Sequence, residues 1–155
     1  MCKVLFFLPV LVLLSMCDNE GDNVLAPDCA AVLCEADFSE LFLEVVSSDT
    51  NENVFFANIH DESDITVNGN PSMNFEIRNV LEKELLVLSD ENWEIGSFEY
   101  TLRIGETNEF VLALELARTG GVGCCANRLF LDNLKINDTV QDVNSRPWIF
   151  TISVN

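Results

Sequence analysis

Basic residues are scarce in this chain. Of 155 residues, 8 are Lys or Arg and 26 are Asp or Glu, which gives a formal net charge of −18 at pH 7. Such a surface repels the phosphates that dominate nucleic-acid affinity, and it also repels anionic lipid headgroups. Nucleic-acid binding is therefore excluded as a function class, and attachment to a membrane would need a means other than charge.

Motifs for catalysis and metal binding are missing as well. His60 is the only histidine, no Cys-x-x-Cys spacing occurs, and no Gly-x-Ser-x-Gly elbow is present. A tetrahedral zinc site would need four cysteine thiolates, and a hydrolase triad lacks its nucleophile motif. We therefore expect no enzyme activity and no cofactor, and we expect His60 to be a solvated loop residue.

The sequence also lacks an apolar run long enough to cross a bilayer. Residues 4–14 are uncharged and largely apolar, but they number eleven, whereas a membrane-spanning helix needs about 20. A run of this length after Lys3 is typical of the hydrophobic region of a signal peptide. We expect residues 1–16 to be a signal peptide, so the protein is exported.

The end of this segment carries a recognisable motif. Residues 14–17 read Leu-Ser-Met-Cys, which resembles the lipobox of bacterial lipoproteins, although Met16 stands where a small residue is usual. The acidic residues at positions 18, 20 and 22 resemble the surface-export signals of lipoproteins from the Bacteroidota. The resemblance implies a small Bacteroidota-type lipoprotein that is lipidated at Cys17 and held at the bacterial outer membrane, with display on the cell surface.

An anchor of this kind suits an acidic protein. By the same resemblance, two or three acyl chains are attached to one cysteine, and two chains suffice for stable anchoring without a basic patch. Residues 17–27 are then the lipidated cysteine and an acidic tether, and residues 28–155 form the folded domain. Removal of residues 1–16 takes away Lys3, which leaves 7 basic and 26 acidic residues, a formal net charge of −19.

Four cysteines remain for the folded domain, and an even number in an exported chain predicts two disulfides. A bond between Cys124 and Cys125 would strain the peptide that joins them. A bond between Cys29 and Cys34 is too long for an extended or helical segment, whose ends are about 17 Å or 7.5 Å apart. We therefore expect one cysteine of each pair to bond one of the other pair, and which meets which stays open.

The hydrophobic pattern of the domain has a period of two. Phe98, Tyr100, Leu102 and Ile104 alternate with polar residues, as in a half-buried strand, and no stretch shows helical periodicity. Short strands separated by turns predict an all-β fold, an antiparallel β-sandwich (immunoglobulin-like or similar) of about seven to eight strands, with an open β-barrel as the alternative. The candidates for these strands are residues 38–47, the short run 54–56, and residues 64–67, 75–80, 81–88, 98–104, 109–118, 129–136 and 148–154.

The two tryptophans have different settings in the sequence. Trp93 follows Asp-Glu-Asn in a turn-like stretch, so it is a candidate ligand contact through an exposed ring, or else a rim residue folded over the end of the sandwich. Trp148 lies on the apolar face of an alternating stretch, and we expect it in the core.

Two further sites are weaker candidates. The oxygens of Asp61, Glu62 and Asp64 cluster in a loop, as calcium prefers, but the EF-hand pattern is absent and we expect no metal centre. The triplet that starts at Asp138 (Asp, Thr, Val) resembles the short O-glycosylation motif of the Bacteroidota, which implies modification at Thr139.

The function expected from these features is that of a membrane-anchored, non-enzymatic binding or interaction module at the bacterial envelope. Its partners would be the membrane, through the lipid, and an unidentified protein or glycan. The alternative is a structural accessory subunit of a larger envelope assembly. An exposed apolar patch would favour the assembly, and a concave pocket near Trp93 would favour ligand binding.

Overall fold

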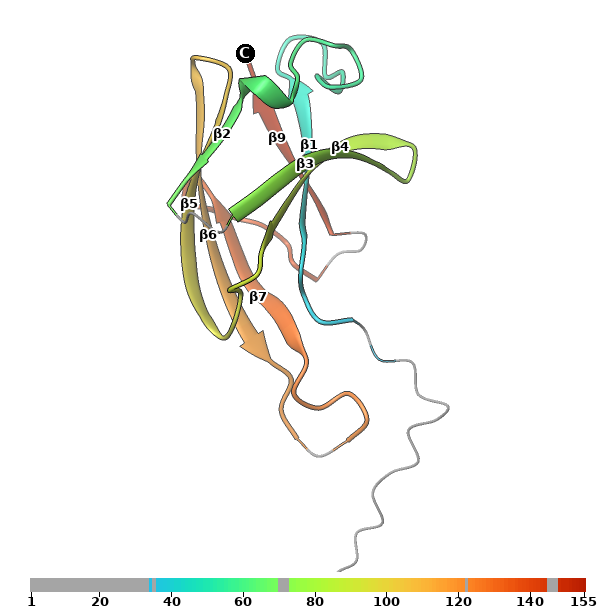
Figure 1. The fold of residues 1–155 in the computed structure, drawn as a ribbon, viewed down its shortest axis with the longest axis vertical. Helices are drawn as coiled ribbons and strands as arrows, with labels where there is room; N and C mark the ends of the chain where they lie inside the picture. Colours follow the sequence, from blue (N-terminus) through green and yellow to red (C-terminus); the bar gives the residue numbers. More distant parts are fainter. Residues whose placement is uncertain (1–33, 35, 70–72, 122, 145–147) are drawn as a thin grey trace, which may run out of the picture.

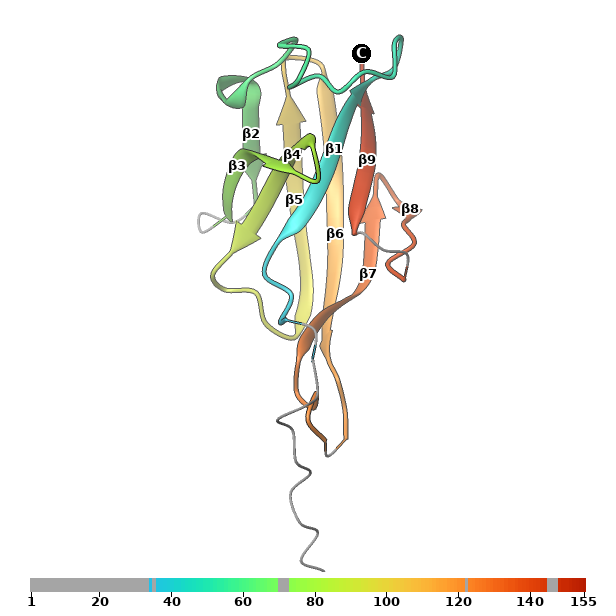
Figure 2. The same ribbon diagram turned by 90° about the vertical axis from the view of Figure 1, so that its right-hand side faces the viewer.

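The computed structural model describes residues 34, 36–69, 73–121, 123–144 and 148–155. These residues form two β-sheets that face each other across a shared apolar core (Figures 1 and 2). The predicted β-sandwich is thereby confirmed, and the open-barrel alternative is wrong because the strands form two separate sheets. The expected signal peptide (residues 1–16), the expected lipid site Cys17 with its tether (residues 17–27), and Cys29 lie outside the described residues.

The first sheet has four strands in the order β3-β4-β1-β9, and the second has five in the order β2-β5-β6-β7-β8. All pairs are antiparallel except β1 with β9, which run parallel. A single 3-10 turn, η1 (Glu62–Asp64), precedes β2. The strands are β1 (Leu41–Ser47), β2 (Ile65–Asn68), β3 (Met73–Val80), β4 (Lys83–Asp90), β5 (Gly96–Ile104), β6 (Asn108–Arg118), β7 (Leu129–Ile136), β8 (Thr139–Val140) and β9 (Ile149–Val154).

Alternation of apolar and polar residues builds most of the core, because successive side chains of a strand point to opposite faces. Every second residue of β6, from Asn108 to Leu116, is buried. In β7 the pattern changes phase: Leu129 and Leu131 are buried, and so are Leu134 and Ile136. The register between β6 and β7 shifts at that point, so an extra residue of β7 keeps both apolar pairs on the core face.

The outer face of the four-stranded sheet has apolar residues at its centre, and charged side chains lie over these residues. Leu85 and Val87 are buried but lie outside the main core. In the register of the sheet, Arg78 is opposite Leu85, and its guanidinium group lies 5.8 Å from the ring centre of Phe42. An ion pair of 2.7 Å joins Arg78 to Glu40. Long charged side chains thus cover this face with their apolar stems.

Some strand boundaries differ from those expected. Residues 54–56 form a hydrogen-bonded turn and no strand, and residues 139–140 form a short strand that the pattern did not predict. The fourth strand starts at Lys83 because Leu81 and Glu82 form the two-residue turn that joins β3 to β4. The apolar character of Leu81 hid this turn from the sequence pattern.

The sandwich has two distinct ends. Segment 48–64 and the C-terminus lie together at one end, which we call the loop end (Figures 1 and 2). The connection between β6 and β7 lies at the opposite end, where Cys34 is bonded to Cys125, and we call it the disulfide end. The two ends place the candidate sites far apart.

Candidate functional site

The disulfide end is where the predicted cross-pairing is found. Cys34 is bonded to Cys125 across 91 residues of sequence, with the two Cα atoms 5.3 Å apart. Cys124 is also disulfide-bonded. Cys29 lies outside the described residues, so its pairing stays a prediction. The confirmed bond fixes the start of the described chain to the connection between β6 and β7.

Hydrogen bonds reinforce this attachment. The backbone N–H of Phe38 donates to the carbonyl of Leu129 at 2.9 Å, and the N–H of Leu129 donates to Oδ1 of Asp37 at 2.9 Å. Thr119 closes the connection between β6 and β7, because its hydroxyl donates to the carbonyl of Cys125. The segment that enters the domain is therefore held by a covalent bond and by a short ladder of hydrogen bonds.

Trp93 belongs to the packed interior and not to an exposed ligand platform. Its side chain is 8% exposed, and its ring stacks on that of Phe38 with the centroids 4.9 Å apart. Its Nε1–H donates to the hydroxyl of Tyr100 at 2.8 Å, and that hydroxyl donates to Oδ2 of Asp90 at 3.1 Å. The expectation of an exposed ring is wrong. The alternative, a residue folded over the end of the sandwich, describes the structure.

Trp148 shows the opposite departure, since it is only partly buried although we expected it in the core. It packs against the core and lines a hollow of about 280 Å³ together with Arg128, Leu129 and Phe130. Its Nε1–H donates to the carbonyl of Val143 at 2.8 Å, which fixes the orientation of the ring. Trp148 and not Trp93 is therefore the tryptophan beside a concave surface.

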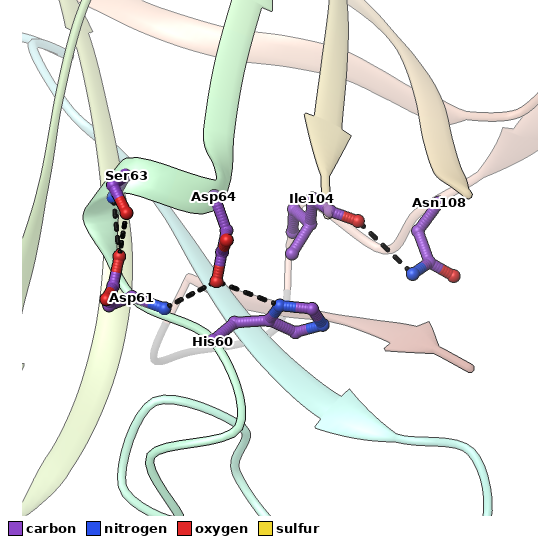
Figure 3. Close-up of polar contacts among 6 residues, drawn as sticks. All are labelled: His60, Asp61, Ser63, Asp64, Ile104 and Asn108. Carbon is purple, nitrogen blue, oxygen red and sulfur yellow. Dashed lines mark hydrogen bonds and ion pairs between the residues drawn. The ribbon is translucent and has the colours of Figure 1, made fainter. Parts of the chain in front are cut away.

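The acidic cluster at the loop end organises a turn (Figure 3). Oδ1 of Asp61 accepts hydrogen bonds from the backbone N–H and the hydroxyl of Ser63, at 2.8 and 2.5 Å. Oδ2 of Asp64 accepts from the N–H of Asp61 at 3.1 Å and lies 3.2 Å from Nδ1 of His60. The two carboxylates thus cap the N-terminus of η1 reciprocally, in a capping box.

This arrangement explains the lowered pKa of Asp61. The hydrogen bonds from the hydroxyl and the N–H of Ser63 stabilise the charged carboxylate and hold the pKa of Asp61 below its usual value of 3.8. Glu62 is exposed beside them. In the described part of the chain, no group of three or more His, Cys, Asp or Glu side chains is placed to hold a metal ion. Of the calcium candidates, Asp61 and Asp64 act as caps in this structure, and Glu62 is exposed.

The same turn is attached to the neighbouring hairpin. The N–H of Gly105 donates to the carbonyl of Asp64 at 2.9 Å, and a Cβ at Gly105 would come within 2.9 Å of the His60 ring. Asn108 bonds the carbonyl of Ile104, as Figure 3 shows, and accepts from the N–H of Asn155. His60 thus packs on the turn between β5 and β6 and makes a structural contact with it.

Thr139 lies on the surface, at the start of β8. It follows a tight turn in which Asn137 and Asp138 both have positive φ angles. Thr139 and Val140 are exposed. A modifying enzyme could reach the Thr139 hydroxyl in this setting, and its glycosylation stays a prediction.

Sequence patterns did not reveal a pair of exposed apolar residues, Phe56 and Leu81. Their exposed fractions are 75% and 68%. A hollow of about 200 Å³ connects the two turns that carry them, and its lining includes Phe56 and the neighbour of Leu81, Glu82. Leu81 and Glu82 form the two-residue turn at this hairpin tip, but the strands expected at 75–80 and 81–88 leave no gap between them, so the sequence pattern did not mark the tip.

The described residues contain no helix that is long and apolar enough to span a membrane. No protein-family model, curated protein or solved structure matches this chain. A functional proposal for this chain therefore depends on its sequence motifs and on the geometry given above.

Proposed function

We propose that this protein is a lipid-anchored, non-enzymatic binding module of the bacterial envelope, attached through Cys17 to the outer membrane. The lipobox-like residues 14–17 and the acidic tether support the anchor. A net charge of −19 after processing supports lipid and not charge as the means of attachment. The partner is a protein or a glycan outside the chain.

One structural observation carries the binding role: the two ends of the sandwich are built differently. The chain enters the domain at the disulfide end, where Cys34 is bonded to Cys125. The exposed apolar side chain of Phe56 belongs to segment 48–64, which lies at the opposite end (Figures 1 and 2). A tether attached at the first end would leave the second free to meet a partner.

The non-enzymatic part of the proposal is supported by the roles of the polar residues. His60 is paired with Asp64 and packed on Gly105, and the buried Asp90 is bonded to Tyr100. These groups are engaged in structural contacts of the kind that hold turns and loops in place. The exposed side chain of Phe56 also favours the second candidate function, that of an accessory subunit of an envelope assembly. In an assembly the contact with the partner would be permanent, whereas a binding module would release its partner.

Substitution of the proposed lipid site tests the anchor. Cys17→Ser should release the protein from membranes into the soluble fraction of the cell, because one hydroxyl cannot replace two or three acyl chains. Cys2→Ser, in the expected signal peptide, is the matched control and should stay in the membrane fraction. Mass spectrometry of the purified protein should find acyl chains on Cys17 in the control alone. Retention of Cys17→Ser in the membrane would contradict the proposal.

A further inference from the structure

We propose that Phe56, Leu81 and the hollow between their turns form a docking site for a basic protein segment that carries exposed apolar side chains. The inference deepens the proposed function and rests on its binding role, because it names the surface and the class of partner. We call the site the tip site, and it consists of Asn53, Phe56, Leu81, Glu82, Lys83 and Glu84.

Phe56 is exposed because a rigid turn directs it outward. The side chains of Val54 and Phe55 are buried in the core beneath it. Oδ1 of Asn53 accepts from the N–H groups of both Phe55 and Phe56 at 3.1 Å, and Nδ2 of Asn53 donates to the carbonyl of Glu84 at 2.7 Å. The ring is therefore presented on a fixed backbone, which lowers the entropy lost when a partner binds it.

The second apolar residue occupies a backbone conformation that disfavours it. Leu81 and Glu82 have φ angles of 52° and 64°, as a type I′ hairpin turn requires at both central residues. Asn-Gly is the preferred pair at these positions, because a side chain on Cβ is crowded in the left-handed region. A leucine that is strained and exposed at once stabilises neither the turn nor the core. Local strain of this kind accumulates at functional sites.

The charge around the tip site indicates the chemistry of its partner. Glu82 and Glu84 line the hollow, and the ammonium group of Lys83 is already 2.7 Å from Oε2 of Glu44. The site therefore presents excess negative charge beside an aromatic ring. A partner with Lys or Arg next to Phe, Leu or Ile complements both features. A second copy of this chain would bring another net charge of about −19 to the contact, which disfavours it.

Other exposed apolar residues do not form a comparable surface. The other exposed large apolar residues of the described chain are Ile59, Ile95, Val111 and Val140, and none of them lines one of the hollows described here. The outer face of the four-stranded sheet is covered by the ion pairs of Arg78 and Lys83. Val140, with an exposed fraction close to that of Leu81, offers a matched control position.

The test uses the purified, oxidised full chain with Cys17→Ser, so that lipid does not contribute to binding. The probes are three labelled twelve-residue peptides: one with four Lys and two Phe, one with Ser in place of Phe, and one with Glu in place of Lys. Fluorescence anisotropy at low and high salt should show binding of the first peptide, at least tenfold weaker binding of the second, and none of the third. The double substitution Phe56→Ser with Leu81→Ser should weaken binding of the first peptide at least tenfold, whereas Val140→Ser should leave the affinity for this peptide unchanged.

A turn variant separates docking from folding. Leu81→Asn with Glu82→Gly installs the preferred type I′ pair, so it should raise the melting temperature of the protein. The same double variant should weaken binding of the first peptide at least fivefold. Equal binding of the Ser peptide, or unchanged affinity in both double variants, would overturn the proposal. Self-association that Phe56→Ser abolishes would overturn it in favour of a second copy. Because the peptides are tested without lipid, a negative result would contradict the tip site and would not affect the proposed lipid anchor at Cys17. In the same way, a negative result in the anchor experiment would not affect the peptide result.

Discussion

The disulfide end and the loop end of the sandwich are held together in different ways. At the disulfide end, a covalent bond joins Cys34 to Cys125, and the buried rings of Phe38, Trp93 and Tyr100 pack beneath it. At the loop end, side-chain caps and backbone hydrogen bonds fix the turns, and the apolar ring of Phe56 is left in solvent.

The two ends of this one domain are therefore stabilised by different interactions. Burial and a covalent bond stabilise the end at which the chain enters, so this end resists unfolding. Hydrogen-bonded turns fix the shape of the loop end, where Val54 and Phe55 are buried and Phe56 is exposed, and each such hydrogen bond makes a modest net contribution to stability. The docking surface that we propose includes Phe56, whose side chain is left exposed at the loop end.

Reduction of the disulfides should produce the largest effect. A bond that closes a loop of about 90 residues contributes up to about 4 to 5 kcal/mol in the chain-entropy model, so reduction should lower the free energy of unfolding by that order. Urea unfolding with and without reductant measures it. Cys34→Ala with Cys125→Ala should lose less, because Cys124 keeps its own bond. If thiol titration showed complete reduction and the urea midpoint were unchanged, the disulfides would not stabilise the domain, and the stated difference between the two ends would be wrong.

Tyr100→Phe should be the next largest change, and it acts beneath the disulfide end. It removes the acceptor for Nε1–H of Trp93 and the donor to Asp90, which leaves buried polar groups unsatisfied at about 1–3 kcal/mol. Urea unfolding gives the loss of stability. Trp148→Phe, at a half-buried ring, is the control and should cost less. A larger loss of stability for Trp148→Phe than for Tyr100→Phe would contradict the conclusion that Trp93 is the more buried of the two tryptophans.

Asn53→Ala tests how the loop end is held. It removes three hydrogen bonds of the turn that carries Phe56, and we expect a loss of about 1–2 kcal/mol. Hydrogen exchange should accelerate within residues 54–59 and stay unchanged at the disulfide end. Asn53→Asp keeps the acceptor oxygen and loses only the donor to Glu84, so it should have a smaller effect. Uniform acceleration across the domain would show that the two ends are not independent.

The smallest effect concerns Asp61 and acid. The folded state holds the pKa of Asp61 below its usual value of 3.8, so its contribution to stability is complete above pH 3.8 and is lost as the pH falls below that value. Asp61→Asn should therefore flatten the decline of the melting temperature between about pH 4 and 2. Glu62→Gln, which removes a neighbouring exposed charge but no cap, is the control. An equal flattening in the control would assign the effect to net charge.

The two tryptophans show where sequence prediction stopped. Local pattern placed Trp148 in the core, because it alternates with polar residues, and left Trp93 open between an exposed ring and a residue folded over the end of the sandwich. Burial depends on what covers a side chain, and Trp93 is covered by Phe38, which lies 55 positions away in the sequence. No local pattern carries that contact. The same limit applies to Phe56, whose neighbours Val54 and Phe55 are buried while it is not.

The sequence by itself determined the fold class and the positions of most strands, and it predicted the cross-pairing of the cysteines, of which the bond between Cys34 and Cys125 is confirmed. These follow from local periodicity and from the reach of a short chain segment, which are properties of the residues alone. Only the tertiary structure decided which cysteines meet, which tryptophan is buried, and that Leu81 stands at a hairpin tip beside the turn of Phe56. Contacts between distant segments depend on how the sheets pack, and this packing is a property of the whole chain.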